Sequence, residues 1–518
     1  MKVEWKKLMF GLAIGAGMMM MASCSDEENF DPGGSTGKET PEPTEKAFLS
    51  MRLSTAGTRV AVDPTTSGRT EEQVVNHVRM VLYETKNNTV RYSWDLNVST
   101  DGMNEFTGGD VVRGEDVPSA TPTVSRFVTV GREVVKQDYE LLILINPPGE
   151  LLEITEQGNP RSYLSRAANM TKESLIQPYG IAADNNFYMT NHQDLIFVPE
   201  VELRDNQRMA EENPVRVEVE RAVAKVVVSG VPEVVPHGDR IDNLKWGLDV
   251  TNMYTYWMRK MTFIANSGGV PNEMEQLNAG YREERYAEDP NFTRFSSWNG
   301  GNPVGQFEYL SGTPELSKNF DDYDYTLENT MDAADQRHDV TTRVVISGTY
   351  TPNGFGSVAT RNGGGISFYY FKGNAIRVEA MRDMVNDRGQ IPQELRDAGL
   401  EQAIENVLAW NPNAFNSPTA SFSEGGINFY YQGVCYYTVL IRHFSNNMVP
   451  VLMGYGRYGV VRNNVYQLSI NKIIGPGQPV INPPGTDPDD EDTSWISADV
   501  NIMRWYIRNP VSYTHLTL

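Results

Sequence analysis

The chain has 518 residues, too many for one hydrophobic core, so two folded domains or slightly more are expected. Its 67 acidic residues outnumber its 45 basic ones, for a formal net charge of −22, and no Lys/Arg cluster of the kind that neutralises phosphates is present, which argues against a nucleic-acid partner. The two cysteines, Cys24 and Cys435, accompany no Cys/His pair, which argues against a structural zinc site, and neither a metal nor a cofactor is expected.

The first 24 residues have the features of an export signal. Three lysines precede an uncharged run over residues 8–22, which is too short for a stable transmembrane helix. The run ends in Met-Ala-Ser-Cys24, which resembles a bacterial lipobox and predicts that Cys24 is acylated and anchors the precursor in a membrane. The acidic residues after it resemble a surface-export signal of some Gram-negative lineages, and residues 25–45 have the composition of a disordered spacer.

The first strand is predicted at the start of the segment 46–59. Ala47, Leu49, Met51 and Leu53 alternate with mostly polar residues and form one apolar face. Leu49, Met51 and Leu53 belong to this face, and the family resemblance given below implies that it is the face of a strand that can be displaced.

A basic loop of small residues follows this strand. Exposed loops of such composition are preferred sites of proteolysis, so an Arg-specific protease is predicted to cut after Arg59. Arg52, within the strand, and Arg69 are weaker candidates.

The last strand is predicted within residues 494–509, behind a Pro-rich, acidic tether at 475–493 that is expected to stay extended and solvated. After Ile502 the apolar set slips by one residue, so the second half should face another surface. Such a strand can join its own sheet or that of a neighbouring molecule. The predicted apolar face of a donor strand consists of Ile496, Ala498, Val500 and Ile502.

Between its ends the chain has short alternating or apolar runs with turn signals, which predict an all-β fold. Helical patterns are confined to residues 161–175 and 392–410, and the second is expected to pack on a sandwich edge through apolar residues at helical spacing. The domain boundary is placed near Ser229-Gly230, which gives domains at 46–228 and 229–474.

Several segments, in their order along the chain, resemble landmarks of the Mfa-like fimbrillins of the FimA/Mfa superfamily, the shaft subunits of type V pili. They are the lipobox, FLSMRLSTAGTR, VKQDYELLILINPP, NNFYMTN, VEVERAVAKVVV, LKWGLDVTN, CYYTVLIRHF and GRYGVVRNNVYQLSINKIIGPG. Residues 510–518 do not continue the closing strand of that family, and Pro510 would stop strand pairing, so we interpret this tail as artefactual.

The resemblance implies a lipoprotein precursor with two tandem β-sandwich domains of transthyretin-like fold, few short helices and an extended C-terminal donor strand. It further implies that an Arg-specific protease removes the first strand at the cell surface. The C-terminal strand of another copy, or of a related fimbrillin, would then fill the groove. The expected function is structural and adhesive, in a surface fimbria whose precursor is anchored in the outer membrane.

Three alternatives remain open. A surface lipoprotein that binds glycans without polymerising would keep its last strand in its own second domain and could use the chain's Tyr and Trp side chains, among them Trp246, Trp257 and Trp410. A tip or anchor subunit would belong to the same family. A secreted hydrolase has no nominated catalytic residue, since the six histidines are scattered and no HExxH motif occurs.

Two further patterns are weak. The GxGxxG match at 454–459 precedes a strand-like run, whereas a dinucleotide site requires a helix there. The acidic clusters at 321–324 and 487–492 lack EF-hand spacing and are interpreted as solvated loops.

Overall fold

The computed structural model divides into two units, Met1–Pro43 and Thr44–Leu518, and the description below concerns the second. Among the described residues, no helix is both long and apolar enough to cross a membrane. The structure describes residues 44–55, 65–66, 68–99, 106–117, 124–156, 158, 161–192, 194–263, 285–292, 305–332, 335–356, 365–443, 457–489 and 495–505.

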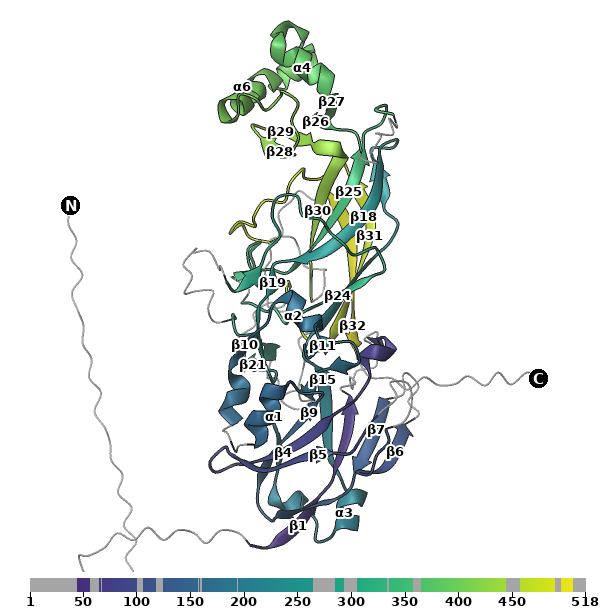
Figure 1. Cartoon of the computed structure of the whole chain (residues 1–518), viewed down its shortest axis with the longest axis vertical. Coiled ribbons are helices and arrows are strands. Elements are labelled where there is room, and N and C mark those ends of the chain that lie inside the picture. Colours follow the sequence, from purple (N-terminus) through teal and green to yellow (C-terminus); the bar gives the residue numbers. More distant parts are fainter. Residues whose placement is uncertain are drawn as a thin grey trace, which may run out of the picture. The chain divides into compact units, whose positions relative to one another are not determined.

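The first sheet contains nine strands among the described residues, and its middle is built from nearly continuous apolar runs (Figure 1). β4 and β9 are antiparallel neighbours whose side chains are almost all buried, as expected of strands covered on both faces. In spatial order the strands are β5 (Val90–Leu96), β4 (Val78–Glu84), β9 (Tyr139–Ile145), β13 (Met189–Asn191), β15 (Val215–Arg221), β2 (Met51–Thr55), β7 (Val124–Thr129) and β6 (Val111–Val117), with β14 (Ile196–Val198) also paired to β9.

Short elements surround this sheet. The strand pairs are β1 (Lys46–Leu49) with β8 (Arg132–Val135), β10 (Ala167–Asn169) with β20 (Tyr254–Tyr256), β11 (Ala182–Ala183) with β12 (Asn186–Phe187), β19 (Thr251–Asn252) with β23 (Phe307–Glu308), and β21 (Met261–Phe263) with β22 (Arg285–Ala287). The helical turns are η1 (Thr70–Glu72), α1 (Gly149–Glu156), η2 (Arg161–Ser165), α2 (Lys172–Ile176), η3 (Glu200–Glu202) and α3 (Gln207–Glu212). The helical pattern at 161–175 is thus two short turns separated by β10.

The second sandwich has two sheets that share one core. Side chains of both sheets meet in that core, among them Trp246, Ile346, Val226 and Leu468. One sheet has the order β24 (Tyr323–Thr326), β16 (Ala224–Ser229), β31 (Asn464–Ile474), β32 (Ile496–Trp505) and β3 (Thr65–Thr66), with β17 (Glu233–Val235) also on β31; the other is β18 (Arg240–Asp249), β25 (Arg343–Thr351) and β30 (Val434–Leu440). The predicted all-β class with tandem sandwiches is confirmed.

The chain passes between the sandwiches earlier than predicted. β15 belongs to the first sheet and β16 to the second, so the change occurs at Ala222-Val223 and not near Ser229-Gly230. The backbone N–H of Arg221 donates to Asn463 Oδ1 (3.1 Å), which marks the point where the chain leaves the first sheet. The Ser-Gly pair marks only a tight turn, because Gly230 has φ +108° and a Cβ there would lie 2.5 Å from the carbonyl oxygen of Ile470.

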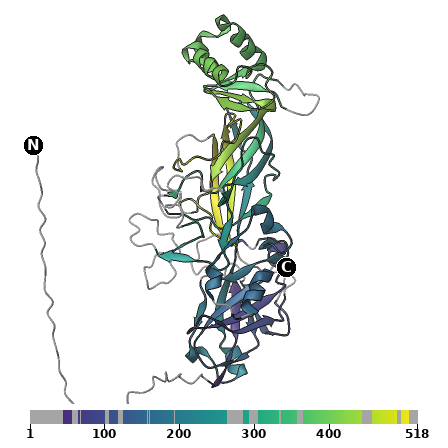
Figure 2. The ribbon, with the colours of Figure 1, turned by 60° about the vertical axis from the view of Figure 1, so that its left-hand side comes forward.

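A small α+β segment, residues 365–431, is inserted between β25 and β30, which are hydrogen-bonded neighbours (Figures 1 and 2). Its sheet has the order β27 (Asn374–Arg377), β26 (Phe368–Phe371), β29 (Ile427–Tyr430) and β28 (Phe422–Glu424); the helices are α4 (Val378–Asn386), η6 (Arg388–Gln390), α5 (Gln393–Asp397) and α6 (Leu400–Trp410), and η7 (Tyr431–Gly433) closes it.

The predicted helix at 392–410 therefore differs from expectation in two ways. It breaks at Gly399, which has φ +91°. Leu395, Leu400 and Ile404 pack into the core of the inserted segment and not on a sandwich edge. Residues 368–377 form a hairpin that turns at Lys372-Gly373.

Candidate functional site

The N-terminal strand segment fills an interior position of the first sheet. β2 runs parallel to β15 on one side and antiparallel to β7 on the other. β1 continues the same run and pairs with β8, and the backbone of Phe48 exchanges hydrogen bonds of 2.7 and 3.0 Å with that of Arg204. Because both edges of β2 are paired, removal of this segment would leave unpaired donors and acceptors on both neighbours.

The side chains of this segment contribute to the first hydrophobic core. Ala47, Leu49, Met51 and Leu53 are each 2% exposed or less and belong to one cluster with the side chains of β4, β9 and β15. Burial of a large aliphatic side chain contributes about 1.5–3 kcal/mol. The segment is therefore both a hydrogen-bonded and an apolar component of the domain that holds it.

One polar residue on the opposite face of the segment is also buried. Ser50 lies between β1 and β2, is 1% exposed, and donates through Oγ to the carbonyl oxygen of Thr129 (2.7 Å). The backbone N–H of Met51 donates to Thr129 Oγ1 (3.0 Å), and the carbonyl oxygen of Ser50 accepts from the N–H of Val215 (2.9 Å). These bonds define a buried polar position that any occupant of the groove must satisfy.

The predicted lipidation and cleavage residues, Cys24 and Arg59, lie outside the described residues. Of the weaker cleavage candidates, Arg52 lies in β2. The guanidinium of Arg69 forms ion pairs with Glu71 (3.0 Å) and Asp184 (3.2 Å). An arginine held in this way is a poorer protease substrate than one in an open loop.

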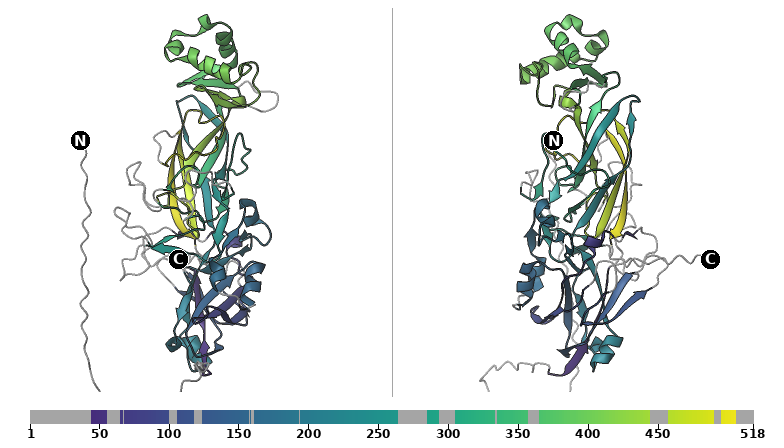
Figure 3. Two further views of the ribbon diagram at one scale, coloured as in Figure 1. Left: turned by 90° about the vertical axis from the view of Figure 1, so that its left-hand side faces the viewer. Right: turned by 45° about the vertical axis from the view of Figure 1, so that its right-hand side comes forward.

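The last strand lies in the sheet of its own second domain. The expected donor strand therefore does not project from the domain in this chain. β32 pairs antiparallel with β31 from Ile473↔Ile496 to Asn464↔Arg504, and Figures 2 and 3 show the two strands side by side in yellow. Among the described residues, its other edge pairs with the two-residue β3, in parallel register at Thr65↔Arg504. β32 is thus near the edge of the sheet.

The faces of β32 follow the alternation in the sequence. Ile496 is 6% exposed, and Ala498, Val500 and Ile502 pack partly buried against the second core. The side chain of Met503 packs instead against the first core, which is the slip expected after Ile502.

The tether that precedes β32 packs on the second domain over residues 475–489, contrary to the prediction that it stays solvated. Gln478 exchanges backbone hydrogen bonds with Tyr436 on β30 (2.9 and 2.8 Å), and Ile481 does so with Gly312 (2.7 and 2.9 Å). Ile481 is 3% exposed in a small cluster that includes Tyr436. The backbone of the tether is therefore satisfied by the domain, which its polar composition does not reveal.

The acidic end of the tether is also anchored. The Asp489 side chain is fully buried, accepts from Thr341 Oγ1 (2.6 Å) and lies 4.0 Å from His338 Nε2. Burial raises the pKa of Asp489 to about 7, although the Thr341 hydrogen bond and the charge of Arg343 act in the opposite direction, and the Asp339 carboxylate also raises it. Residues 487–489 of the acidic cluster, which was predicted to be a solvated loop, are in this respect part of the domain, and residues 490–492 lie outside the described residues.

Docking of the tether is expected to weaken as pH rises from about 5 to 8. The folded state keeps the Asp489 proton at pH values where the unfolded chain, with an ordinary carboxyl near 3.8, has released it. Stability from this group is thus present below pH 4 and lost as the pH passes 7. Hydrogen exchange of the amides of Gln478 and Ile481 should be faster at pH 8 than at pH 5 after correction for intrinsic rates. The Asp489→Asn variant should lose this difference, and an unchanged difference would contradict the assignment.

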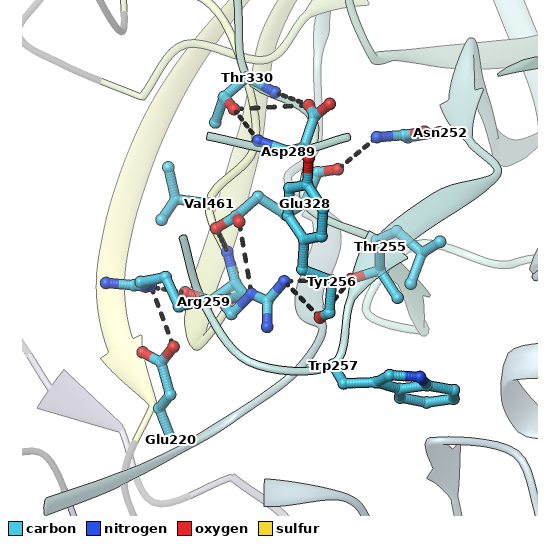
Figure 4. Close-up of polar contacts among 12 residues, drawn as sticks. Glu220, Asn252, Thr255, Tyr256, Trp257, Arg259, Asp289, Glu328, Thr330 and Val461 are labelled. Atoms are coloured by element: carbon cyan, nitrogen blue, oxygen red, sulfur yellow. Dashed lines mark hydrogen bonds and ion pairs between the residues drawn. The ribbon is translucent and has the colours of Figure 1, made fainter. Parts of the chain in front are cut away.

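A buried ionic network connects the first sheet to the second (Figure 4). Glu220 of β15 pairs with Arg259 (3.0 Å), whose guanidinium donates to the carbonyl oxygen of Arg462 (3.2 Å) just before β31. Arg462 in turn pairs with Glu328 (3.4 Å) and donates to Thr255 Oγ1 (3.0 Å). Side chains of both ion pairs are 1% exposed or less, so removal of one partner would leave a buried charge.

Asp289 adds a further buried carboxylate to the same region. It accepts backbone hydrogen bonds from Asn291 (2.6 Å) and Thr330 (2.5 Å), as Figure 4 shows for Thr330. Burial raises its pKa to about 7, against the effect of these bonds, and the charge of Glu328 raises it further. The carboxylate is fully engaged with main chain, so its environment fits a structural role better than a catalytic one.

Histidine–carboxylate pairs, which the sequence did not suggest, include two that are also hydrogen-bonded. His192 Nδ1 lies 2.9 Å from Glu220, and His77 lies beside Asp95. Each carboxylate is shared with an arginine, Glu220 with Arg259 and Asp95 with Arg79. Within the described residues, no group of three or more His, Cys, Asp or Glu side chains could hold a metal ion.

The aromatic residues considered for a sugar platform do not lie together on the surface. Trp246 and Trp257 are 0% and 4% exposed and belong to the two sandwich cores. Trp410, at the end of α6, is 54% exposed and packs against Phe422 at 5.5 Å between ring centroids. After the GxGxxG match comes β31, a strand, so the helix that a dinucleotide site requires is not there.

Sequence reasoning missed the residues that surround the terminal strands. No local sequence pattern marks Thr129, Arg216 or the β3 residues as neighbours of the terminal strands. Their contacts depend on which strand lies beside them in the folded chain. Ile481 offered one signal, as an isolated apolar residue within a polar, Pro-rich run.

Two family models match the chain. The model described as major fimbrial subunit protein (FimA) matches residues 47–221, and the model described as major fimbrial subunit protein type IV, fimbrillin, C-terminal, matches residues 428–510. These segments contain both terminal strands and the first sheet. A search of curated proteins found no match.

Solved structures with similar folds are distant in sequence. A fimbrilin (FimA) from Porphyromonas gingivalis is 14% identical, with 90% of this chain and 99% of that chain covered and a TM-score of 0.39. The tip fimbrial protein Mfa3 from P. gingivalis, with a C-terminal truncation, is 11% identical, with 89% and 100% covered and a TM-score of 0.33. A fimbrial assembly protein from Parabacteroides distasonis is 14% identical, with 60% and 83% covered and a TM-score of 0.30.

A FimA model thus matches the first sheet and a fimbrillin model matches the C-terminal strands, so these two parts of the chain are similar to the major fimbrial subunit proteins.

Proposed function

We propose that this chain is a fimbrillin and a shaft subunit of a surface fimbria that polymerises by protease-assisted strand exchange. The chain is exported as a lipoprotein acylated at Cys24, an Arg-specific protease cuts after Arg59, and the strand at 46–55 leaves. The C-terminal strand of the next subunit then enters the groove between β15 and β7. No catalytic activity is assigned to the chain, and its adhesive role is exerted through the assembled fibre.

The observation that carries this proposal is the position of the N-terminal segment. β2 lies inside a sheet, with both edges paired and its side chains in the core. An ordinary edge strand could be lost with little effect, whereas loss of β2 opens a groove with an apolar floor and unpaired polar edges. Such a groove requires another strand, and β32 supplies one with a matching apolar face from near the edge of its own sheet.

Cleavage is needed because the first strand is tethered to its own groove. A tethered strand acts at an effective concentration of roughly millimolar, so a free strand of equal quality cannot displace it by mass action. Once the connection is cut, the strand can dissociate and be diluted.

Release of β32 from its own sheet is the matching step in the donor. Ile496, Ala498, Val500 and Ile502 must leave the second core and enter the first core of another subunit. Ala498, Val500 and Ile502 are only partly buried in their own sheet, whereas the groove positions are 2% exposed or less, so the transfer would increase apolar burial. The persistence of the fibre would also come from slow unfolding of the filled sandwich.

A glycan-binding monomer remains the second candidate, because in the uncut chain β32 lies in its own domain, as that function would require. The two candidates differ after cleavage. The shaft subunit forms polymers, and the glycan binder stays monomeric and binds sugars before and after protease treatment. Deletion of residues beyond Thr493 distinguishes a tip subunit from a shaft subunit. A tip subunit should still assemble, because it only accepts a strand, whereas a shaft subunit should no longer donate its strand and polymerise.

The lipid anchor has its own test. The Cys24→Ser chain is expected to incorporate no labelled palmitate and to leave the membrane fraction, because a serine cannot form the thioether and multiple acyl chains are needed for stable attachment. Cys435→Ser is the matched control, since its buried thiol lies in the second core and should leave labelling unchanged. Equal palmitate incorporation into the Cys24→Ser and parent chains would contradict the lipobox assignment.

A further inference from the structure

The outer face of the groove carries a positive charge beside the strand that is predicted to leave. In the parallel register of β2 and β15, Arg52 lies directly opposite Arg216, and Arg216 is exposed. Like charges directly opposite one another on a sheet destabilise the pair, whereas opposite charges stabilise it. A strand with an acidic residue at the position of Arg52 would place an opposite charge beside Arg216.

The C-terminal strand repeats the pattern of the N-terminal segment with the charge reversed. When Trp495 is placed at the position of Phe48, the apolar residues Ile496, Ala498 and Val500 coincide with Leu49, Met51 and Leu53. Ser497 then coincides with Ser50, whereas Ile502 falls on Thr55. Asp499 then takes the place of Arg52. This alignment keeps the same face in the core, because it preserves the alternation of the two strands.

The buried polar position at Ser50 favours this direction over the reverse. The donor strand could also enter in the opposite direction with Asp499 still at the position of Arg52. In that case Asn501 would occupy the position of Ser50. That position is 1% exposed and closed by Thr129, and a larger side chain would be overpacked there. Ser497 is the same residue as the one removed, so it can donate to the carbonyl oxygen of Thr129 in the same way. In either direction Asp499 lies opposite Arg216.

We infer that Asp499 of the incoming strand pairs with Arg216 of the accepting subunit, and that Ser497 takes the place of Ser50 against Thr129, which together set the register of the joint. This inference rests on the proposed strand exchange and names its specificity-determining residues. The partner is a second copy of this chain, or a related chain with an acidic residue at the same point of its last strand.

Strand exchange would give the Asp499 carboxylate a charged hydrogen-bond partner in place of a neutral one. In its parent sheet Asp499 accepts a hydrogen bond from the amide of Asn471 (2.8 Å) and lies opposite Ser469. In the accepting sheet it would face a guanidinium, and charge-assisted hydrogen bonds are stronger than those from a neutral amide. The pair lies on the exposed face, so it should act on the rate and register of assembly and respond to salt.

The test uses charge reversal in the full chain, cut with an Arg-specific protease. All chains carry Arg52→Gln, so that the departing strand makes the same contact in each. Asp499→Arg should slow the formation of denaturant-resistant ladders about fivefold at low salt, the size expected when one favourable cross-strand charge pair becomes unfavourable. Adding Arg216→Asp to Asp499→Arg should restore the rate, and 1 M salt should reduce the difference.

The control variant is Asp242→Arg, which makes the same charge change as Asp499→Arg at an exposed position of β18, in the other sheet of the second domain. It should assemble at the parental rate. A cut parent that forms no ladders would overturn strand exchange and this pairing with it. A parent that forms ladders while Asp499→Arg keeps the parental rate would overturn the pairing alone.

Direction is tested by cysteine pairs. Thr129→Cys with Ser497→Cys should give disulfide-linked ladders, because the Ser50 and Thr129 hydroxyls whose places they take are 3.4 Å apart. Thr129→Cys with Asn501→Cys should not. Linking by the second pair and not the first would overturn the proposed direction.

Discussion

Cleavage after Arg59 is expected to convert the monomer into a ladder of polymers that survives mild denaturant, whereas the Arg59→Ala chain treated in the same way stays monomeric. The effect should be close to all-or-none. Without the cut, the tethered strand holds the groove at roughly millimolar effective concentration. With the cut, a strand from another chain meets an open groove flanked by β15 and β7. Gel electrophoresis without boiling measures the ladder, and mass spectrometry of the new N-terminus locates the cut.

Two variants control this experiment. Arg69→Ala should assemble as the parent does, because its guanidinium is engaged with Glu71 and Asp184 and lies beyond the predicted cut. A cleaved chain that lacks residues beyond Thr493 should accept a strand but donate none, and so it should terminate ladders of the parent. Ladders from the Arg59→Ala chain, or a parent that stays monomeric after a confirmed cut, would contradict the proposed assembly.

Arg462→Met is expected to destabilise the chain by about 3–5 kcal/mol, the cost of leaving one member of a buried ion pair without its partner. The Glu328 carboxylate is fully buried and pairs with the Arg462 guanidinium. The same guanidinium also donates to Thr255 and to the carbonyl oxygen of Tyr256. Denaturant unfolding measures the loss of free energy of unfolding.

Its control is Arg208→Met, which removes an arginine that is 83% exposed and paired with Glu212 on α3. A surface pair of this kind contributes under 1 kcal/mol, so little change is expected. The double variant Arg462→Met with Glu328→Leu should recover much of the loss, because the unpaired buried charge is gone. Equal stability of the Arg462→Met and Arg208→Met chains would contradict the assigned role of the network.

The sequence predicted which faces of the terminal strands are apolar but not which sheets hold them. The alternation around Met51 and that around Val500 are both properties of single strands, and each follows from the two-residue period of a strand. Pairing partners are set by tertiary packing. β32 therefore joined β31 of its own domain, and β3 joined β32, although no local signal marks Thr65 or Thr66 as a strand.

Composition did not predict correctly which segments pack on a domain where a few specific contacts outweigh the average polarity of the segment. The tether is rich in Pro, Gly and Asp, yet the hydroxyls of Tyr430 and Tyr437 donate to its Gly477 and Gly475 carbonyl oxygens, and Ile481 is buried. In the same way, the boundary predicted at Gly230 followed a real turn, but the change of sheets depends on the contact between Arg221 and Asn463. α4, with buried Met381 and Met384, was not predicted because it directly follows residues with a strand pattern.

The inserted α+β segment leaves the chain and returns to it through two strands that remain bonded to each other. Val434 at the start of β30 pairs with Thr349 near the end of β25, and the segment also has a hydrophobic core of its own. The base of the segment contacts the second core and the start of β32, because Phe368 and Tyr430 belong to that core and Tyr370 packs against Trp495. Its helices α4 to α6 pack in the separate core, so their sequence can diversify or be exchanged for foreign epitopes with little effect on either terminal strand. In a polymer the segment would be displayed once per repeat, which makes it the natural position for antigenic variation and for engineered display.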